Sequence, residues 1–139
     1  MKLIEKILAV IFLLVAVGVW IIVLNVGGGT RIREVDNAVA ITKGGNPIRG
    51  YHAIQMFGCG ACHTIPGVPG ATGKVGPSLE EFRERPLIAG ELTNTAEHLV
   101  QWIRHPREID SKTAMPELGV SEEEARDIAA YLYALRTRF

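Results

Sequence analysis

The chain has 139 residues and a mass of 15.2 kDa, which leaves room for one small domain and little else. Its 15 Lys and Arg residues balance 15 Asp and Glu residues, so it lacks the basic excess that marks nucleic-acid-binding proteins. Two cysteines are too few for a disulfide-rich secreted scaffold or for a zinc site with four thiolates.

The first predicted element is a membrane-spanning helix over residues 7–24, a stretch without charge or proline. Eighteen helical residues span roughly 27 Å, close to the hydrocarbon thickness of a bilayer. Trp20 lies near the end of this stretch, where an indole ring reaches the lipid headgroups. A cleaved signal peptide, which has a shorter apolar run, and a buried soluble helix are the alternatives. We expect an uncleaved single-pass anchor over residues 1–29.

The glycines Gly27 to Gly29 are expected to end this helix, and the polar residues 30–45 to form a flexible tether. Asn46 and Pro47 then provide an N-cap and a first helical residue. They predict a helix that runs to about Ala61 and opens a domain over residues 46–139.

Two further helices are predicted from capping-box patterns. Asn94 with Glu97 opens a helix that ends at His105, before a proline, and Ser121 with Glu124 opens the last helix. No run alternates with period two for long enough to predict a strand. The domain is therefore expected to be all-α, with three or four short helices and long loops.

The predicted core is thin for a stable domain. Apolar residues recur at helical spacing in the last two helices: Leu99, Trp102, Ile103, Ile128, Tyr131, Leu132 and Leu135. Short helices with many glycines bury little apolar surface. We therefore infer that a non-protein group fills the middle of the domain.

The sequence Cys59-Gly-Ala-Cys62-His63 matches C-x-x-C-H, the attachment signature of c-type haem. In this motif each cysteine forms a thioether with a haem vinyl group, and the histidine becomes the proximal iron ligand. A thioredoxin-type motif would need a β-α-β pattern, and a zinc site would need a fourth ligand. A chance match of inert cysteines is the remaining alternative, and it leaves the membrane anchor unexplained. We predict one covalent haem c, bound through Cys59 and Cys62.

Met115 is the predicted second iron ligand, so His63 and Met115 are the expected metal ligands. The candidates are Met56, His52, His98, His105 and Met115. Met56 and His52 lie on the helix that leads into the cysteines, so they cannot reach the opposite haem face. Met115 stands in a loop that Pro116 stiffens, and a Met/His pair is typical of cytochromes c. The other histidines are expected to have surface or helix-end roles.

From about Asn46 to Phe139 the chain resembles the class I cytochromes c. The resemblance rests on these segments: the helix ending in CGACH, residues 76–79 (GPSL), the helix with Leu99, Trp102 and Ile103, residues 114–116 (AMP), and the aromatic C-terminal helix. It implies that the Pro77 carbonyl accepts a hydrogen bond from Nδ1–H of His63, a contact that orients the ring and raises its basicity.

The resemblance also implies that the Gly50/Ile54 face of the first domain helix crosses the Tyr131/Leu132 face of the last one. Trp102 is a candidate contact of the haem propionates in such a fold. Three arginines are further candidates, although solvated surface charges are an equal alternative for them: Arg83, Arg85 and Arg104.

Residues 63–90 are more specifically similar to membrane-bound cytochrome c subunits of bacterial respiratory complexes, such as haem–copper oxidase partners and the monohaem subunit of alternative complex III. This similarity implies a one-electron carrier rather than an enzyme, a subunit of a respiratory or photosynthetic electron-transfer complex. Its expected partners are redox proteins and other membrane subunits, and no nucleic acid. Because covalent haem attachment takes place after export, we expect the haem domain on the periplasmic or extracellular side of the inner membrane. A free membrane-tethered shuttle, a peroxidase-like enzyme and a haem sensor are the alternatives.

Overall fold

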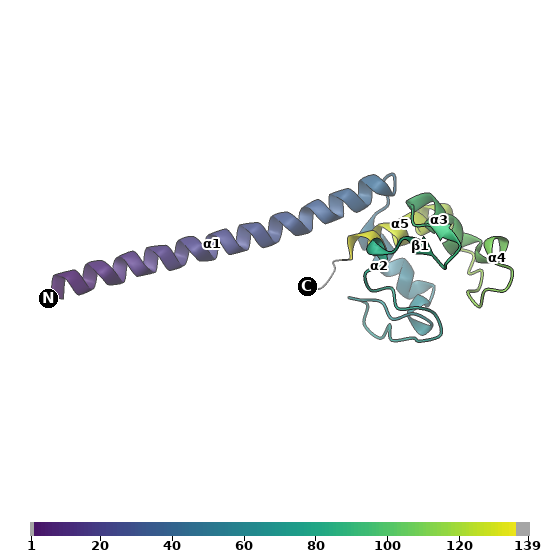
Figure 1. Ribbon diagram of the computed structural model, residues 1–139, viewed down its shortest axis with the longest axis horizontal. Coiled ribbons are helices and arrows are strands. Elements are labelled where there is room, and N and C mark those ends of the chain that lie inside the picture. The colour runs from purple at the N-terminus through teal and green to yellow at the C-terminus, as the bar shows by residue number, and fades with distance from the viewer. Residues whose placement is uncertain (1, 136–139) are drawn as a thin grey trace. The chain divides into compact units, whose positions relative to one another are not determined.

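The computed structural model describes residues 2–135, with side chains for 3–24 and 32–135. The chain divides into two compact units, Met1–Arg33 and Glu34–Phe139. The first consists of most of helix α1 (Lys2–Ile41), and the second holds the end of α1 and all other elements (Figure 1).

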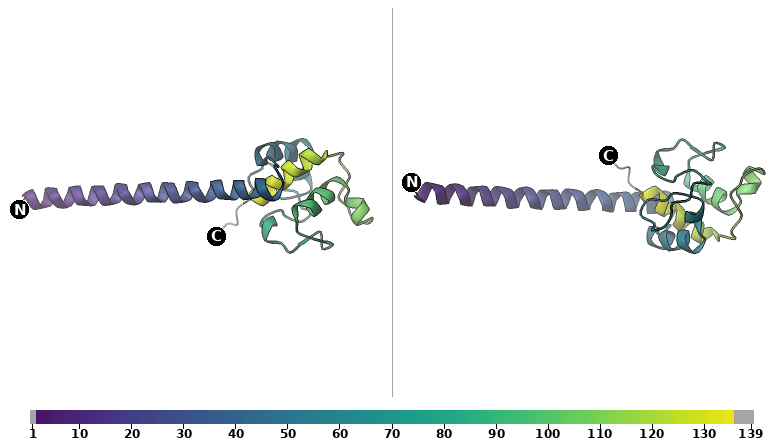
Figure 2. Two further views of the ribbon diagram at one scale, coloured as in Figure 1. Left: turned by 90° about the horizontal axis from the view of Figure 1, so that it is seen from above. Right: turned by 90° about the horizontal axis from the view of Figure 1, so that it is seen from below.

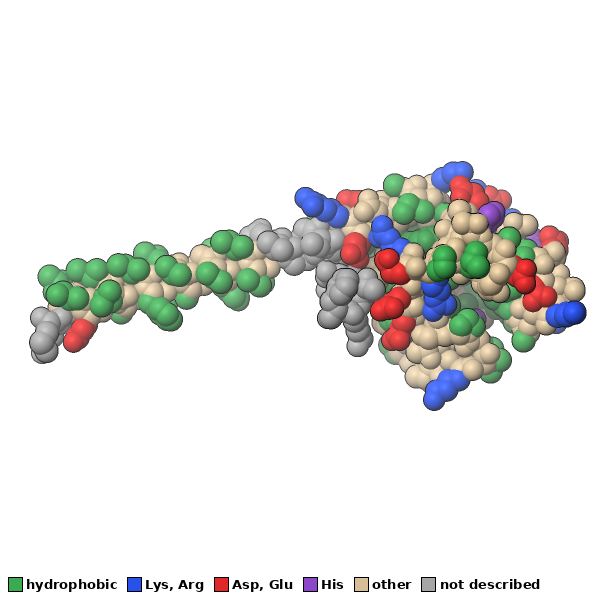
Figure 3. All heavy atoms as spheres, viewed as in Figure 1, with side chains coloured by type: hydrophobic (Ala, Val, Ile, Leu, Met, Phe, Trp, Pro, Cys, Tyr) green, Lys and Arg blue, Asp and Glu red, His purple; other side chains and the backbone are tan. Residues whose placement is uncertain are grey.

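Helix α1 contains the apolar segment Leu3–Leu24, which is long and apolar enough to cross a membrane. Among the described residues it is the one helix with this property. Its side chains are exposed, and hydrophobic groups cover the visible side of the segment (Figure 3). An apolar surface of this length requires a nonaqueous environment, which fits membrane anchoring.

The predicted end of the first helix at Gly27 to Gly29 is wrong, because α1 continues to Ile41. Glycine lowers helix stability by about 1 kcal/mol per residue relative to alanine, but it keeps every backbone hydrogen bond. The last turns of α1 gain tertiary packing instead, since Ala38 is completely buried in the domain core. Residues 30–41 are therefore helical, whereas the division into anchor, tether and domain stays a prediction.

Helix α1 ends in a Schellman motif after Ile41. Lys43 and Gly44 both have positive φ, and the amide of Gly44 donates a hydrogen bond to the carbonyl of Val39 at 2.9 Å. The hydroxyl of the buried Thr42 donates to the carbonyl of Ala38 at 2.7 Å. These bonds satisfy the last carbonyls of the helix and turn the chain toward Asn46.

Helix α2 (Pro47–Met56) begins as predicted, with the Asn46 side chain accepting from the amides of Ile48 and Arg49. It ends five residues earlier than predicted, because Gly58 adopts a left-handed conformation with φ of 67°. A separate 3₁₀ turn, η1 (Cys59–Ala61), follows. The cysteine motif therefore stands on its own turn rather than on the end of α2.

Helix α5 (Glu122–Ala134) begins with the predicted capping box between Ser121 and Glu124. It lies between α2 and α3 (Ala96–Arg104), as the two views of Figure 2 show. The crossing of α2 and α5 is as predicted: a Cβ on Gly50 would lie 2.5 Å from the carbonyl carbon of Asp127, so only glycine allows this approach. Tyr51 and Tyr131 also meet across it, with ring centroids 5.9 Å apart.

The buried carboxylate of Asp127 on α5 joins this helix to the start of α2. It accepts hydrogen bonds from the amide of Asn46 at 2.7 Å and from Arg49 Nε at 2.6 Å and Nη2 at 3.0 Å. The hydrogen bond and charge of Asp127 raise the pKa of Arg49. A carboxylate in this position is stabilising only while all three donors remain, because an unpaired buried charge is costly.

The remaining elements are short. They are η2 (Phe82–Glu84), β1 (Leu87–Ile88), β2 (Leu92–Thr93) and α4 (Pro106–Ile109). Strands β1 and β2 form an antiparallel pair in which Leu87 faces Thr93 and Ile88 faces Leu92. Helix α3 is capped by Thr95, so the predicted cap at Asn94 is wrong by one residue. The domain is mostly helical and fits the cytochrome c fold, as predicted.

Candidate functional site

The motif C-x-x-C-H forms a single turn that places both thiols and the imidazole on neighbouring positions. The amides of Cys62 and His63 both donate to the carbonyl of Cys59, at 3.2 and 3.0 Å. Both cysteines are free and half-buried. Burial raises the pKa of Cys59, so its thiol stays protonated, unlike the reactive thiolates of disulfide oxidoreductases.

His63 is oriented by the carbonyl of Pro77. Its Nδ1 lies 2.7 Å from that oxygen, and a carbonyl only accepts hydrogen bonds, so Nδ1 carries the proton. Nε2 is then the nitrogen with the free lone pair. This is the contact that the resemblance implies, and it leaves His63 ready to donate Nε2 to an iron atom.

Gly76 provides the space in which the His63 ring lies. Its amide donates to the carbonyl of Cys62 at 2.9 Å, which brings its Cα against the imidazole. A Cβ at this position would lie 2.7 Å from Nδ1 and 2.9 Å from Nε2 of His63. The sequence shows this glycine only as part of the segment GPSL, and its role was not predicted. The signal that could have identified it is its position directly before Pro77.

The loop after His63 is tied to the motif and to α5. The amide of Leu79 donates to the carbonyl of Thr64 at 2.8 Å, and the Thr64 hydroxyl donates to the carbonyl of Gly73 at 3.0 Å. From α5, the hydroxyl of Tyr131 donates to the carbonyl of Pro66 at 2.7 Å. These bonds fix a loop that has no regular secondary structure of its own.

Met115 and Trp102 both contact the apolar core. Met115 is half-buried in the loop between α4 and α5, and its amide donates to the Thr113 hydroxyl at 3.2 Å. Trp102 is buried on α3. Both side chains therefore pack in or against the core. The role of Met115 as an iron ligand and that of Trp102 as a propionate contact stay predictions.

The three arginine candidates differ in their surroundings. Arg85 donates to the carbonyls of Ser78 and Glu80, and Arg104 lies 3.6 Å from Glu122. Arg83 is half-buried within η2. The Arg85 side chain therefore forms hydrogen bonds with nearby backbone carbonyls, and the sequence pattern did not predict these bonds.

The remaining histidines have partners away from the motif. His98 donates from Nδ1 to the carbonyl of Thr93 at 2.8 Å, because that carbonyl only accepts. His105 lies 3.9 Å from Glu108, and the His52 ring meets the Tyr51 ring edge-on at 5.3 Å. These contacts agree with surface and helix-end roles.

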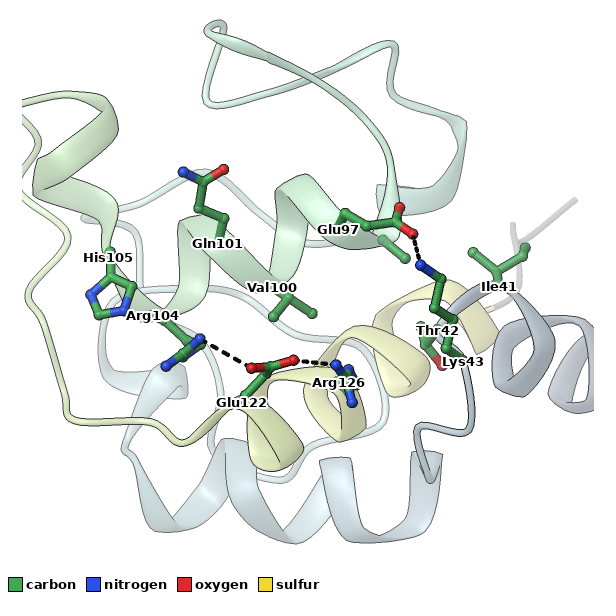
Figure 4. A pocket seen from close by; sticks show the side chains of 11 residues that line it. Ile41, Thr42, Lys43, Glu97, Val100, Gln101, Arg104, His105, Glu122 and Arg126 are labelled. Atoms are coloured by element: carbon green, nitrogen blue, oxygen red, sulfur yellow. Dashed lines mark hydrogen bonds and ion pairs between the residues drawn. The ribbon is translucent and has the colours of Figure 1, made fainter.

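A pocket of about 280 Å³ lies elsewhere in the domain, between the end of α1, α3 and α5 (Figure 4). Its charged side chains pair with one another: Lys43 with Glu97 at 2.9 Å, and Glu122 with Arg104 and Arg126. The cysteine motif and Met115 are not among its lining residues. The pocket is therefore separate from the site.

The residues of the motif fit a covalently attached haem. Two free thiols stand one turn apart, and the adjacent imidazole has its proton on Nδ1 and its lone pair on Nε2. Across residues 2–135, no three His, Cys, Asp or Glu side chains come together as a cage for a metal ion such as zinc. The donor set suits haem better than zinc.

Comparisons with known proteins agree with this fit. Residues 45–132 match the family described as "Cytochrome C oxidase, cbb3-type, subunit III". Over 89 residues the chain is 35% identical to "Cytochrome c oxidase subunit 2" of Alkalihalophilus pseudofirmus, an alignment that covers 63% of this chain and 25% of that protein. No solved structure matches the chain. Since the family match covers more than half of its residues, the chain belongs to the cytochrome c family of cbb3-type oxidase subunit III.

Proposed function

We propose that the protein is a membrane-anchored electron carrier that works as a subunit of a respiratory electron-transfer complex. The observation that carries the proposal is the C-x-x-C-H turn with Nδ1 of His63 held by Pro77 at 2.7 Å. A bound haem supplies one-electron redox chemistry at its iron. The cytochrome c domain itself indicates electron transfer, and the name of its partly aligned relative supports an oxidase as the partner.

The chain's own residues have three tasks in this function. Cys59 and Cys62 hold the cofactor, so that it is not lost when the protein docks and releases partners. His63 and Met115 would be the two protein ligands of a bound haem iron, a Met/His pair that suits electron transfer rather than binding of a substrate. Buried apolar side chains, among them Ile65 and Trp102, exclude water from the core.

The net charge of the whole chain is zero, but its two compact units carry opposite net charges. Glu34–Phe139 has eleven Lys and Arg residues against fourteen Asp and Glu, a net charge of −3, and Met1–Arg33 has a net charge of +3. The domain by itself favours docking to basic partner surfaces, with rates that fall as ionic strength rises.

The domain is proposed to face the periplasm or cell exterior, because covalent haem attachment takes place there. We expect protease added to intact spheroplasts to remove an epitope tag placed after Phe139. An epitope tag placed before Met1 is the matched control and stays protected until the cells are lysed. Protection of the C-terminal tag in intact spheroplasts would contradict this orientation.

Association with other subunits is tested by purification in mild detergent at low ionic strength. We expect the tagged chain to migrate with oxidase subunits, because the apolar segment Leu3–Leu24 confines it to the bilayer. A tagged, unrelated single-helix membrane protein is the control for nonspecific recovery. Migration of the chain as a lone monomer would contradict the complex and favour a tethered shuttle.

A further inference from the structure

Asn94 is the centre of a hydrogen-bond network between α5 and the segment before β1. Its side-chain nitrogen donates to the carbonyls of Phe82 and Arg85, both at 2.9 Å. Its side-chain oxygen accepts from the hydroxyl of Tyr133 at 2.7 Å. Both side-chain amide protons and the side-chain oxygen of Asn94 therefore have partners. Asn94 directly precedes Thr95, the N-cap of α3.

The network continues from Arg85 toward Pro77. The guanidinium of Arg85 donates to the carbonyl of Ser78, the residue that follows Pro77, and to the carbonyl of Glu80 at 3.0 Å. Its Cζ lies 5.8 Å from the centre of the Phe82 ring, which limits its movement. A connected set of contacts thus leads from Tyr133 on α5 to the segment whose carbonyl holds His63.

Tyr133 is suited to hold this hydrogen-bond network in place. It is buried on α5, and its ring meets that of Phe82 at 5.9 Å. Burial, with a smaller contribution from Glu97, raises the pKa of Tyr133 to about 12. The phenol therefore remains a neutral donor over the working pH range, and its loss would leave the Asn94 oxygen without that partner.

We propose that Asn94 and Tyr133 are positioning residues that hold the Pro77 carbonyl against Nδ1–H of His63 and thereby tune the electron affinity of the iron. The inference rests on the proposed function, since it needs His63 as an iron ligand. A hydrogen bond at Nδ1 makes the imidazole a stronger donor, which favours the oxidised iron. Loosening the segment weakens this bond and favours the reduced iron.

The test compares full-length haem-loaded variants at the midpoint potential of the wild type, where the ratio of reduced to oxidised protein is one. We expect the ratio of reduced to oxidised protein to rise about threefold in Asn94→Ala and in Tyr133→Phe. In the reduced protein, hydrogen exchange at Nδ1 of His63, followed by NMR, is expected to become about tenfold faster. Tyr133→Phe removes a single oxygen, so it keeps the test available where Asn94→Ala does not fold.

Thr95→Ala is the matched control. Thr95 caps α3 through the amide of His98 and lies beside Asn94, so its loss lowers stability without removing a bond of the network. We expect its reduced fraction and exchange rate to equal those of the wild type. If the wild type holds haem and titrates reversibly, this inference is overturned when the reduced fraction and the exchange rate are unchanged in both Tyr133→Phe and a folded Asn94→Ala. That result would leave the proposed function intact. A wild type without covalent haem would instead overturn the proposed function.

Discussion

Replacing Met115 with histidine is expected to lower the midpoint potential by roughly 0.1–0.3 V, a part of the ~0.8 V range that axial ligands cover. Thioether sulfur stabilises reduced iron better than a second imidazole does. The half-buried position of Met115 against the core is compatible with a ligand that is shielded from water. Redox titration with optical detection measures the shift, and the weak far-red sulfur-to-iron band should disappear.

Met56→His is the matched control for this prediction. Met56 stands at the end of α2 with an exposed side chain, on the helix that leads into the cysteines. We expect Met56→His to keep both the potential and the far-red band. Met115→Ala should open the sixth position, so that carbon monoxide binds the reduced protein. Wild-type spectra and potential in both Met115 variants would show that another residue binds the iron.

Replacing Gly76 with alanine is expected to reduce haem incorporation at least fivefold and to destabilise the loaded protein by about 1–3 kcal/mol, the usual range for overpacking. The added Cβ would lie 2.7 Å from Nδ1 of His63, so either the ring or the Pro77 segment must move. Haem content per polypeptide and thermal unfolding of the loaded fraction measure the two effects.

Gly90→Ala separates steric overlap from backbone strain. Gly90 has φ of +80°, yet a Cβ there meets nothing within 4 Å. This variant has only the backbone cost of a left-handed alanine, about 1–2 kcal/mol. We expect its haem content to remain at the wild-type level. Equal haem content in Gly76→Ala and wild type would show that the space beside the His63 ring does not matter.

Local chemistry made several features predictable from the sequence. Asn46-Pro47 and the Ser121/Glu124 box specify helix starts by short-range hydrogen bonds, and both begin helices in the structure. Gly50 was recognised because a close helix crossing requires the absence of a side chain. The C-x-x-C-H motif similarly has a fixed local geometry, since its residues share one turn.

Features that depend on tertiary contacts were not predictable in the same way. Helix α1 continues through three glycines to a last turn in which Ala38 is buried among residues distant in the sequence. Asn94 has the sequence pattern of a cap, but the hydroxyl of Tyr133 and two carbonyls take its side chain, so Thr95 becomes the cap. The early end of α2, in contrast, has a local cause: Gly58 follows the C-cap Phe57 in a left-handed conformation, a common way for glycine to end a helix.

The central claim is that the CGACH turn holds one covalent haem c. It is tested most directly by the intact mass of the purified chain after extraction with acidified organic solvent, which removes haem that is not covalently bound. We predict that the polypeptide retains the mass of one haem, and that Cys59→Ser with Cys62→Ser retains none. A wild-type chain that leaves the extraction at the mass of the bare polypeptide would contradict the claim.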